Sequence, residues 1–494
     1  MSENTSVREP SMLDALIPVV AIIIMLATSV YLYGADSSYG ANQIALLLGA
    51  GIATLIGLKN GLTWHNIEEG IVHGISISLG AILILLSVGS LIATWILSGT
   101  VPTLIYYGLA VLHPAIFYPA ACFICAVVGL SIGSSWTVAG TLGIALIGVA
   151  TAMGLSPAIT AGAIISGAYF GDKMSPLSDT TNLAPAVAGS ELFAHIRHMM
   201  WTTIPSLAIA LVGFGIIGVI QHGEGGTGGF NAMTDVLAQN FQTGWYLLIP
   251  LALVMYMAYR KVPAFPAMMI GALLGGVFAV IFQPDKAIAL ADNAELSRGM
   301  AMLSGVWIAL FDGYVSKTGN EVVDELLSRG GMSSMLNTIW LILCAMTYGA
   351  VLERTGMLQK LLTAALRMAK STGSLIVTTL VTSFGTNIIA ADQYIAIVLP
   401  GRLYRLEFQR RKLAPVNLSR ALEDAGTITS PLIPWNTCGA YMAGTLGVPT
   451  LAYLPFCFFN LVNPLLAAGY AFAGFKIEPL RDDERVEVVS AVVP

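Results

Sequence analysis

Charged residues are scarce in this sequence: Asp, Glu, Lys and Arg make up 10% of the 494 residues, whereas 56% are hydrophobic. Soluble globular proteins carry about 25% charged residues, so this chain has too few to cover a water-facing surface. Apolar runs close to the roughly 17–25 residues that cross a bilayer recur along the chain. They do not alternate as the strands of a membrane β-barrel do. The composition therefore predicts an all-α polytopic membrane protein, for which membrane lipid is the surrounding partner.

Cysteines and catalytic motifs are also few. The five cysteines lie in apolar stretches, and the C-x-x-C of Cys122 and Cys125 falls inside one of them, which favours packing over redox or zinc chemistry. The polar stretch QHGEGGTGGFN at 221–231 lacks the G-K-[ST] ending of a phosphate loop. H-E-x-x-H, G-x-S-x-G and basic clusters with interleaved aromatics are absent. We expect neither an enzyme nor a nucleic-acid-binding protein, and no cofactor.

The predicted membrane spans follow the apolar runs. They lie near 14–33, 41–58, 74–97, 113–131, 157–170, 199–220, 244–259, 264–283, 333–353, 372–400 and 450–474. The segments near 98–112 and 299–315 are short or interrupted, and re-entrant or interfacial positions are the alternatives for them. The polar N-terminal residues lack the basic start of a secretory signal. The first apolar run is therefore expected to be a retained transmembrane helix.

Three pairs of segments match across the chain. GISISLGAILILLSVGSLIATWILSG at 74–99 lines up with GMSSMLNTIWLILCAMTYGAVLERTG at 331–356. SIGSSWTVAGT at 131–141 matches SFGTNIIAADQ at 383–393, and SPLSDTTNLAPAVAG at 175–189 matches SPLIPWNTCGAYMAG at 430–444. The offsets are 257, 252 and 255.

These matches predict two structural halves. The expected divisions are a first repeat at 1–220, a linker at 221–243, a second repeat with one extra connecting helix at 244–476, and a polar tail at 477–494.

The charges of matched loops differ between the two halves. Segment 354–370 has four basic residues and 401–412 has five, whereas their counterparts in the first half have none. Basic loops tend to stay on the cytoplasmic side, so matched loops are expected to face opposite sides of the membrane. This pattern favours two inverted repeats, an architecture of many secondary transporters. Sequence drift between two parallel repeats is the alternative.

Each half also contains a polar interruption. In GDKMSPLSDTTN at 171–182, Pro176 removes one helical hydrogen bond, and TITSPLIPWNTCG repeats the break with Pro431 and Pro434. Unwound backbone at membrane depth survives only inside protein or beside a water-filled cavity. Two broken helices in matching positions therefore predict a transport site. GSSWTVAGT and GTNIIAADQ, with Gly and a polar pair between apolar segments, suit hairpin tips or unwound turns.

Aspartates lie in or beside these polar segments. Inserting an Asp near the bilayer centre costs about 2.5–3.5 kcal/mol of free energy, so we expect each of these aspartates to have a function. A carboxylate among hydroxyls and carbonyls suits a small hard cation such as Na⁺ and also binds a proton. We place Na⁺ at Asp179 and Asp392. The predicted ion- and proton-binding residues are Asp172, Asp179, Thr180, Thr181, Asn182, Ser134, Ser135, Thr386, Asn387, Asp392, Asn436 and Thr437.

Structural readings compete with these roles. Asp179 at a helix start suits an N-cap, and Asp172 beside its basic neighbour suits an interfacial ion pair. A structural hydrogen bond or a surface position is the alternative for Asp392. Glu423 and Asp424 follow a basic loop and are expected on a solvated face.

Further polar and aromatic residues also have two interpretations. Lys173 is expected in a salt bridge within the motif. The alternative is a cavity-facing position, in which it pairs with an aspartate when Na⁺ is absent or holds an organic carboxylate. Trp136 and Trp435 lie beside the breaks, where they wall a pocket or simply pack. His195 and His198 form H-x-x-H, for which an amphipathic helix at the membrane interface is favoured over metal binding.

The segment GDKMSPLSDTTNLA at 171–184, together with the SPL-containing second break, resembles the NhaC-type sodium/proton antiporters over roughly 11–475. The resemblance implies a bacterial inner-membrane secondary transporter built from inverted repeats, each with a re-entrant hairpin and a broken helix. It implies exchange of Na⁺ for H⁺, with small cations as cargo.

Relatives that exchange malate for lactate make a Na⁺- or H⁺-coupled organic anion or amino acid antiporter the alternative. A channel is an alternative of another class, and a homodimer is the alternative to a monomer.

Overall fold

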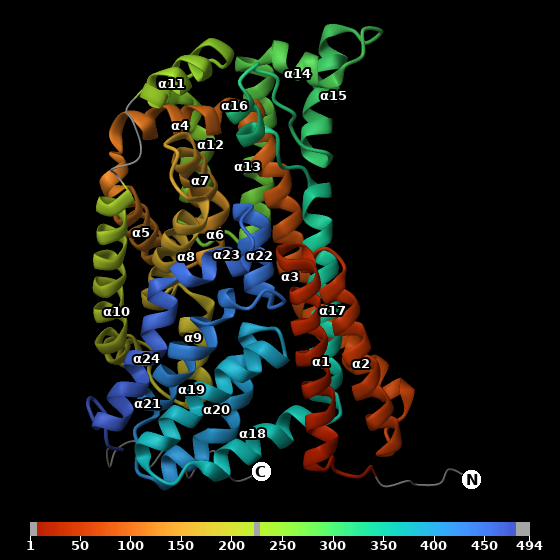
Figure 1. Ribbon diagram of the computed structural model, residues 1–494, viewed down its shortest axis with the longest axis vertical. Coiled ribbons are helices and arrows are strands. Elements are labelled where there is room, and N and C mark those ends of the chain that lie inside the picture. The colour runs from red at the N-terminus through yellow and green to blue at the C-terminus, as the bar shows by residue number, and fades with distance from the viewer. Residues whose placement is uncertain (1–6, 222–227, 481–494) are drawn as a thin grey trace.

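The computed structural model describes residues 7–221 and 228–480, and this part of the chain is almost entirely helical (Figure 1). Its only extended pairings are the isolated bridges Tyr314–Arg329 and Leu413–Pro479. Within the described ranges, 9 helices are long and apolar enough to cross a membrane, or up to 11 when two bent pairs are counted. The prediction of an all-α polytopic membrane protein is confirmed.

The described helices run in chain order as follows. The first set is α1 Met12–Tyr33, α2 Ala41–Lys59, α3 Trp64–Leu97, α4 Thr100–Val111, α5 Pro114–Ile132, α6 Ser135–Val138, α7 Ile144–Ala152, α8 Pro157–Met174, α9 Asp179–Ala188 and α10 Leu192–Gln221. The second set is α11 Gly228–Asn240, α12 Ile249–Tyr259, α13 Ala264–Phe282, α14 Pro284–Ala291, α15 Arg298–Phe311, α16 Glu321–Leu327, α17 Leu336–Arg354, α18 Met357–Met368, α19 Thr372–Ile389, α20 Gln393–Arg410, α21 Pro415–Leu422, α22 Thr437–Leu446, α23 Thr450–Tyr453 and α24 Phe458–Ala473.

Helices from distant parts of the sequence pack together around the centre. The long helix α3 lies against α13 and α17, while α10 lies against α5 and α24. Helices α1 and α2 pack on each other, and α2 also packs on α17, at one side of the molecule (Figure 1). The segments on either side of the predicted linker are therefore interleaved.

Helices α5 and α8 pack closely over much of their length because glycines line their contact. A side chain at Gly167 would place its Cβ 2.0 Å from the carbonyl oxygen of Cys122, and one at Gly171 would lie 2.4 Å from the backbone nitrogen of Leu130. Small residues let membrane helices approach to backbone contact. This contact fixes α8, whose last turn carries two charged residues of the predicted motif, and it gives the buried cysteines of α5 a packing role.

The predicted single span at 372–400 is wrong, because the structure divides it into α19 and α20. Ala391 between them has a left-handed backbone with φ of 57°. Asp392 then accepts hydrogen bonds from the next free backbone N–H groups, so the helix restarts instead of continuing. Thr386 and Asn387 lie inside α19, before this turn, and the expectation that they form its tip is also wrong.

The predicted span at 450–474 is also interrupted. It is divided into two parts, Thr450–Phe456 and Phe458–Ala473, which are bent by 58°. The segments left unassigned near 98–112 and 299–315 are the short apolar helices α4 and α15.

Helix boundaries recur at a nearly constant separation. Ser134 and Asp392 both cap helices and lie 258 positions apart, and the same separation joins the caps Ser178 and Asn436. Helices α4 and α18 each have 12 residues and begin 257 positions apart. These boundaries are separated by 257 or 258 positions, close to the first sequence offset of 257 and larger than the other two, 252 and 255.

The predicted linker and tail fall partly outside the described residues. Of the linker 221–243, residues 222–227 are outside, and α11 covers most of the remainder. Of the tail 477–494, residues 481–494 are outside. The division into domains at these boundaries stays a prediction.

Candidate functional site

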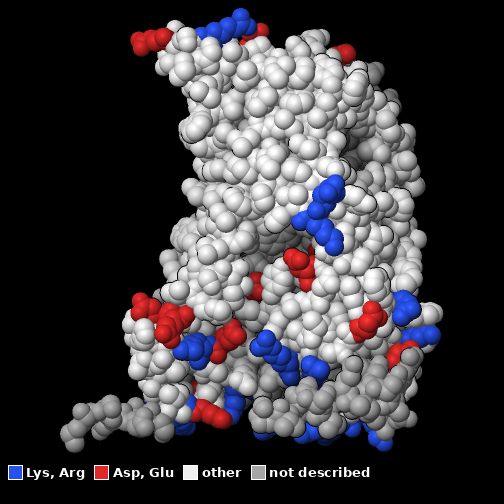
Figure 2. Space-filling model, turned by 180° about the vertical axis from the view of Figure 1, so that it is seen from behind, with Lys and Arg blue, Asp and Glu red and all other residues white. Residues whose placement is uncertain are grey.

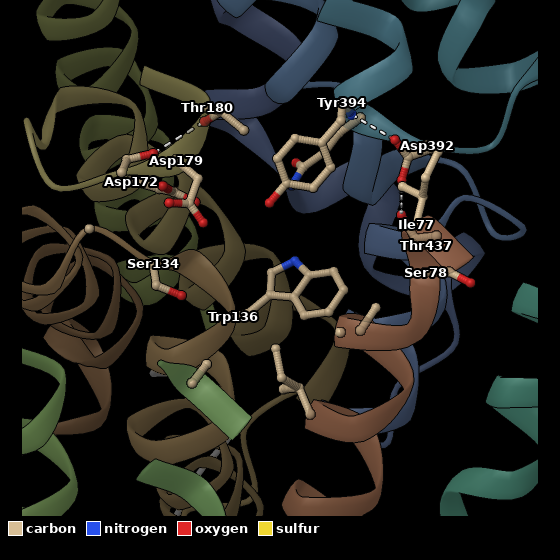
Figure 3. A pocket seen from close by; sticks show the side chains of 17 residues that line it. Ile77, Ser78, Ser134, Trp136, Asp172, Asp179, Thr180, Asp392, Tyr394 and Thr437 are labelled. Carbon is tan, nitrogen blue, oxygen red and sulfur yellow. Dashed lines mark hydrogen bonds between the residues drawn. The ribbon is translucent and has the colours of Figure 1, made fainter. Parts of the chain in front are cut away.

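A cavity of about 290 Å³ lies where the two polar interruptions face α3 (Figure 3). Its described lining includes Asp172, Asp179 and Asp392 but no Lys or Arg. Asp172 and Asp179 occupy one wall and Asp392 the opposite wall, with the rings of Trp136 and Tyr394 between them. On the space-filling surface, acidic side chains lie in a recess near the middle of one face (Figure 2).

Asp172 is held in place by Ser135. It lies in the last turn of α8 and is 8% exposed. Its Oδ2 accepts hydrogen bonds from the backbone N–H of Ser135 at 3.1 Å and from the Ser135 hydroxyl at 2.6 Å. Ser135 opens α6 immediately after the turn at Gly133, so these bonds tie the end of α8 to the turn between α5 and α6.

Asp179 is the exposed carboxylate of the cavity. It is the first residue of α9, but the N-cap is Ser178, whose hydroxyl accepts from the backbone N–H of Thr181 at 3.4 Å. The cap reading for Asp179 is therefore wrong. Within the described residues no hydrogen bond or ion pair engages the Asp179 side chain. The neighbouring Thr180 hydroxyl lies 3.2 Å from that of Ser178.

Asp392 has both a structural and a cavity-facing position. Its Oδ1 accepts from the backbone N–H groups of Tyr394 at 2.8 Å and Ile395 at 3.1 Å, which caps α20. Its Oδ2 accepts from the Thr437 hydroxyl at 3.4 Å, at the start of α22. Only 3% of Asp392 is exposed, so the structural hydrogen bond exists and the surface alternative is wrong.

The twelve predicted site residues divide into two groups. Those that line the cavity are Ser134, Asp172, Asp179, Thr180, Asp392 and Thr437, and Ser135 lies directly behind Asp172. Those that the structure places elsewhere are Thr181, Asn182, Thr386, Asn387 and Asn436. Most of this second group donate hydrogen bonds to backbone carbonyls that the interruptions leave free.

Asn387 shows how the second group acts. Its amide donates to the carbonyl of Gly426 at 2.5 Å and to the Thr429 hydroxyl at 3.1 Å, and Asn436 in turn donates to the Asn387 side chain at 3.1 Å. These bonds join α19 to the segment that precedes α22. Asn387 and Asn436 therefore hold the second interruption in shape behind the cavity.

The remaining residues of this group have similar bonds. Thr181 donates to the carbonyls of Asp172 and Lys173, and Asn182 donates to those of Pro176 and Ser178. Thr386 donates along its own helix to Thr382.

The two tryptophans beside the interruptions have different positions. Trp136 lines the cavity and stacks on Tyr441, with ring centroids 4.0 Å apart and planes at 11°. The Trp435 indole donates to the carbonyl of Ile388 at 2.8 Å and is not among the lining residues. Tyr394 lines the cavity as well, and its ring lies between the two acidic walls (Figure 3). It was not among the predicted site residues, although it follows Asp392 by only two positions.

A second polar cluster lies behind the cavity. Glu423 and Asp424 are both 0% exposed, so the prediction of a solvated face is wrong. The physical reason is that α21 turns inward after the basic loop and packs against α9, α10 and α19. Lys173, also fully buried, forms an ion pair with Asp424, and Arg420 lies 3.9 Å from the same carboxylate.

Neutral groups complete the environment of Asp424. Its Oδ1 accepts from the Thr202 hydroxyl and the Asn463 amide, each at 2.9 Å. Lys173 therefore pairs with a residue 251 positions away and does not face the cavity. The prediction of a salt bridge within the motif is wrong, because this side chain points to the segment after α21.

His195 and His198 are 0% and 6% exposed within the 30-residue helix α10. The expected amphipathic helix at the membrane interface is therefore wrong. No group of His, Cys, Asp and Glu suited to a metal ion occurs in the described ranges.

The fold and this cavity define a polytopic helical membrane protein with an acidic cavity between interrupted helices. The sequence model of the Na⁺/H⁺ antiporter family matches residues 167–475. Together with the relatives below, this match shows that the chain belongs to that family, and the resemblance to the NhaC-type antiporters is confirmed.

Three relatives illustrate the range of the family. The chain is 40% identical to the Na⁺/H⁺ antiporter NhaC of Alkalihalophilus pseudofirmus, over 88% of this chain and 91% of that one. It is 38% identical to the malate-2H⁺/Na⁺-lactate antiporter of Bacillus subtilis, over 87% and 89%. It is 37% identical to the arginine/ornithine antiporter ArcD of Halobacterium salinarum, over 98% and 96%.

Proposed function

We propose that this protein is a secondary active antiporter that exchanges Na⁺ for H⁺ across the cytoplasmic membrane through the acidic cavity. The observation that carries the proposal is the set of Asp172, Asp179 and Asp392 around one cavity whose described lining has no basic side chain. Carboxylates held together without a cation repel one another, and either a metal cation or a proton relieves that repulsion. Na⁺ and H⁺ therefore compete for the same groups.

The oxygen-rich wall at Asp172 and Asp179 suits Na⁺. The hydroxyls of Ser134 and Thr180 line the cavity beside these carboxylates, and hard oxygen donors at unwound segments are typical of Na⁺ sites in secondary transporters. On the opposite wall, Asp392 and the Thr437 hydroxyl offer a second set of oxygens. In the proposed cycle, Na⁺ that binds at these carboxylates displaces a proton from the site on one side of the membrane, and the reverse occurs on the other.

Two inverted repeats are the proposed architecture for this exchange. Helices α4 and α18, which begin 257 positions apart, lie at opposite ends of the molecule (Figure 1). Basic side chains gather at the end that carries α18 (Figure 2), and such loops tend to be cytoplasmic. The turns at Gly133 and Ala391, also 258 positions apart, are the proposed tips of two re-entrant hairpins.

Coupled transport of an amino acid is the second candidate. A cavity of about 290 Å³ offers more room than a bare ion needs, and the rings of Trp136 and Tyr394 line it. Aromatic faces attract organic cations, and the acidic lining favours an amine over an unaccompanied carboxylate. The cargo named for the relative from Halobacterium salinarum, arginine and ornithine, fits this chemistry.

Proton flux in proteoliposomes tests both candidates. With a pH dye inside, pulses of external Na⁺, Li⁺ or K⁺ are applied without organic solute. Na⁺-driven alkalinisation of the lumen that K⁺ does not produce supports Na⁺/H⁺ exchange. No response to any cation, followed by uptake of labelled arginine in exchange for internal ornithine, would replace it with the second candidate. Glu68→Gln, at an exposed position of α3, is the matched control.

A further inference from the structure

Glu423 has an unusual environment for a carboxylate. It opens a π-helical turn, Glu423–Thr427, and its exposed fraction is 0%. Neither carboxylate oxygen accepts a hydrogen bond within the described residues, and the buried Thr427 hydroxyl has no partner there either. A buried ionised carboxylate without hydrogen bonds is strongly disfavoured. Glu423 therefore needs a proton or a cation to be stable where it lies.

The charges around Glu423 do not balance. Lys173 and Arg420 supply two positive charges, whereas Asp172, Glu423 and Asp424 supply three negative ones. Beyond them, Lys476 beside His198 and Glu478 beside Arg420 add one charge of each sign, and Asp179 beside Asp172 adds a further negative one. The Lys173–Asp424 ion pair and the approach of Arg420 to Asp424 account for the two cations of the cluster. One negative charge remains, shared between Glu423 and Asp172, for which the described cluster offers no cation.

Two histidines also face this cluster from α10, so their protonation bears on the charge count. His195 interacts with Lys173, and His198 interacts with Arg420 and Asp424. Both are buried beside these cations, which favours their neutral forms. The excess negative charge therefore stays on the carboxylates.

Glu423 is adjacent to the cavity although it does not line it. Asp172 and Lys173 are the charged groups that act on it, and the hydroxyls of Thr180 and Thr427 lie nearby without completing a hydrogen bond to its carboxylate. Asp172 and Thr180 are themselves part of the cavity wall. A cation that binds at Asp172 therefore lies one residue away from Glu423, and its charge acts on the Glu423 proton through a water-poor region.

We propose that Glu423 is the proton-carrying residue of the transport site, which loses its proton when Na⁺ occupies the cavity beside Asp172. This inference rests on the proposed Na⁺/H⁺ exchange and names the group that couples the two ions. In the step, the O–H bond of the Glu423 carboxylic acid breaks and the proton leaves to solvent. The carboxylate and Asp172 then share the positive charge of Na⁺, so the net charge of the cluster is the same before and after.

A purely structural role makes a different prediction. If Glu423 were a permanently ionised counterion for Lys173 and Arg420, Glu423→Gln would leave a buried cation unbalanced and lower the stability of the fold. If Glu423 is the proton carrier and rests in its protonated form, glutamine copies its shape and charge. Glu423→Gln would then fold normally and lose only the exchangeable proton.

The test is Na⁺-induced proton release from the full chain in detergent, in weak buffer with a pH dye. Addition of NaCl, with choline chloride as the blank, is expected to release close to one proton per bound Na⁺ from the wild type. In Glu423→Gln the release is expected to fall by about tenfold or more, with an unchanged Tm and a retained Na⁺-dependent change in tryptophan fluorescence. Glu423→Asp is expected to restore release at a shifted pH, and Glu68→Gln to match the wild type.

The outcomes separate this inference from the proposed function. Wild-type release that persists in Glu423→Gln overturns the role of Glu423 and leaves Na⁺/H⁺ exchange standing. A large fall in Tm for Glu423→Gln, without recovery of release in Glu423→Asp, also overturns it in favour of a structural counterion. A wild type that shows neither proton release nor a fluorescence response to Na⁺ contradicts the proposed function itself.

Discussion

Asp172 and Lys173 are neighbours in the sequence, yet they belong to two regions that differ in whether their charged side chains are paired. Asp172 faces a cavity whose carboxylates have no described basic partner, while Lys173 turns away into an ion pair with Asp424. In the second region both cations lie against the carboxylate of Asp424, Lys173 from 251 positions away and Arg420 from four. The comparison teaches that paired charges hold the interrupted helices together, whereas unpaired carboxylates are free to take up an ion.

The largest expected effect comes from breaking the paired region. Asp424→Ala leaves Lys173 buried without its counterion, and such a change costs about 3–5 kcal/mol of stability. We expect a large fall in Tm in detergent and little protein in the membrane. The double variant Lys173→Met/Asp424→Leu removes both charges and should recover most of the lost stability. A single variant as stable as the wild type would show that the pair does not support the fold.

The next effect concerns the unpaired region. Asp179→Asn removes a carboxylate that no described group neutralises, so the fold should be kept while Na⁺ binding weakens by about 10- to 100-fold. Na⁺-dependent proton movement in proteoliposomes should fall accordingly. Asp392→Asn should also weaken it, with some loss of stability because its amide oxygen caps α20 less well. Normal exchange in Asp179→Asn would remove that residue from the site.

A smaller effect is expected at the aromatic wall. Trp136→Phe keeps an apolar ring but shortens the stack on Tyr441, so a site for Na⁺ alone should change little, by about twofold or less in apparent affinity. If an amino acid is the cargo, loss of the larger ring should weaken its uptake by about fivefold, since a desolvated cation–π contact is worth about 1 kcal/mol. Na⁺ flux and arginine uptake measured in parallel on this variant show which of the two transport activities depends on the Trp136 ring.

The smallest effect is expected at an acid that only caps a helix. Glu191 accepts from the backbone N–H groups of Phe193 at 2.9 Å and Ala194 at 2.7 Å, and these bonds lower the pKa of this exposed carboxyl. Because the folded-state pKa is lowered, its stabilising contribution is present above the unfolded pKa and is lost as the pH falls through the folded value.

Tm measured against pH should therefore show a slightly shallower acid decline in Glu191→Gln. Transport should be unchanged, in contrast to the capping acid Asp392. Loss of exchange in Glu191→Gln would contradict this prediction, because it would show that Glu191 does more than cap a helix.

Much of the cavity could be predicted from local sequence signals. Pro176 and the polar residues around it identified the first interruption, and acids inside apolar segments identified Asp172 and Asp392. The helical membrane fold followed from composition alone. The amides of Asn387 and Asn436 were predicted as ligands, but in the structure they donate to the backbone carbonyls of Gly426 and Asn387, and which carbonyls need a donor depends on the tertiary path of the turn.

The buried cluster could not be predicted from local sequence because tertiary packing creates it. Glu423 and Asp424 follow a strongly basic loop, which locally indicates a solvated surface, and only the inward path of α21 buries them. The partner of Lys173 lies 251 positions away. The one local signal was the spacing of Arg420 and Asp424 by four positions, which brings their side chains together on a helix. The division at Ala391 was likewise hidden, since a non-glycine residue adopts the left-handed turn.

The most direct test of the central claim is the affinity of the purified protein for ²²Na⁺ as a function of pH. If Na⁺ and H⁺ compete for the same site, lowering the pH below the point at which the site protonates should raise the apparent Kd for Na⁺. The rise should be about tenfold for each pH unit. The Kd should level off at higher pH, and Asp179→Asn should lose the tight binding throughout. A Kd that is independent of pH, with Na⁺ still bound, would contradict competition at a shared site.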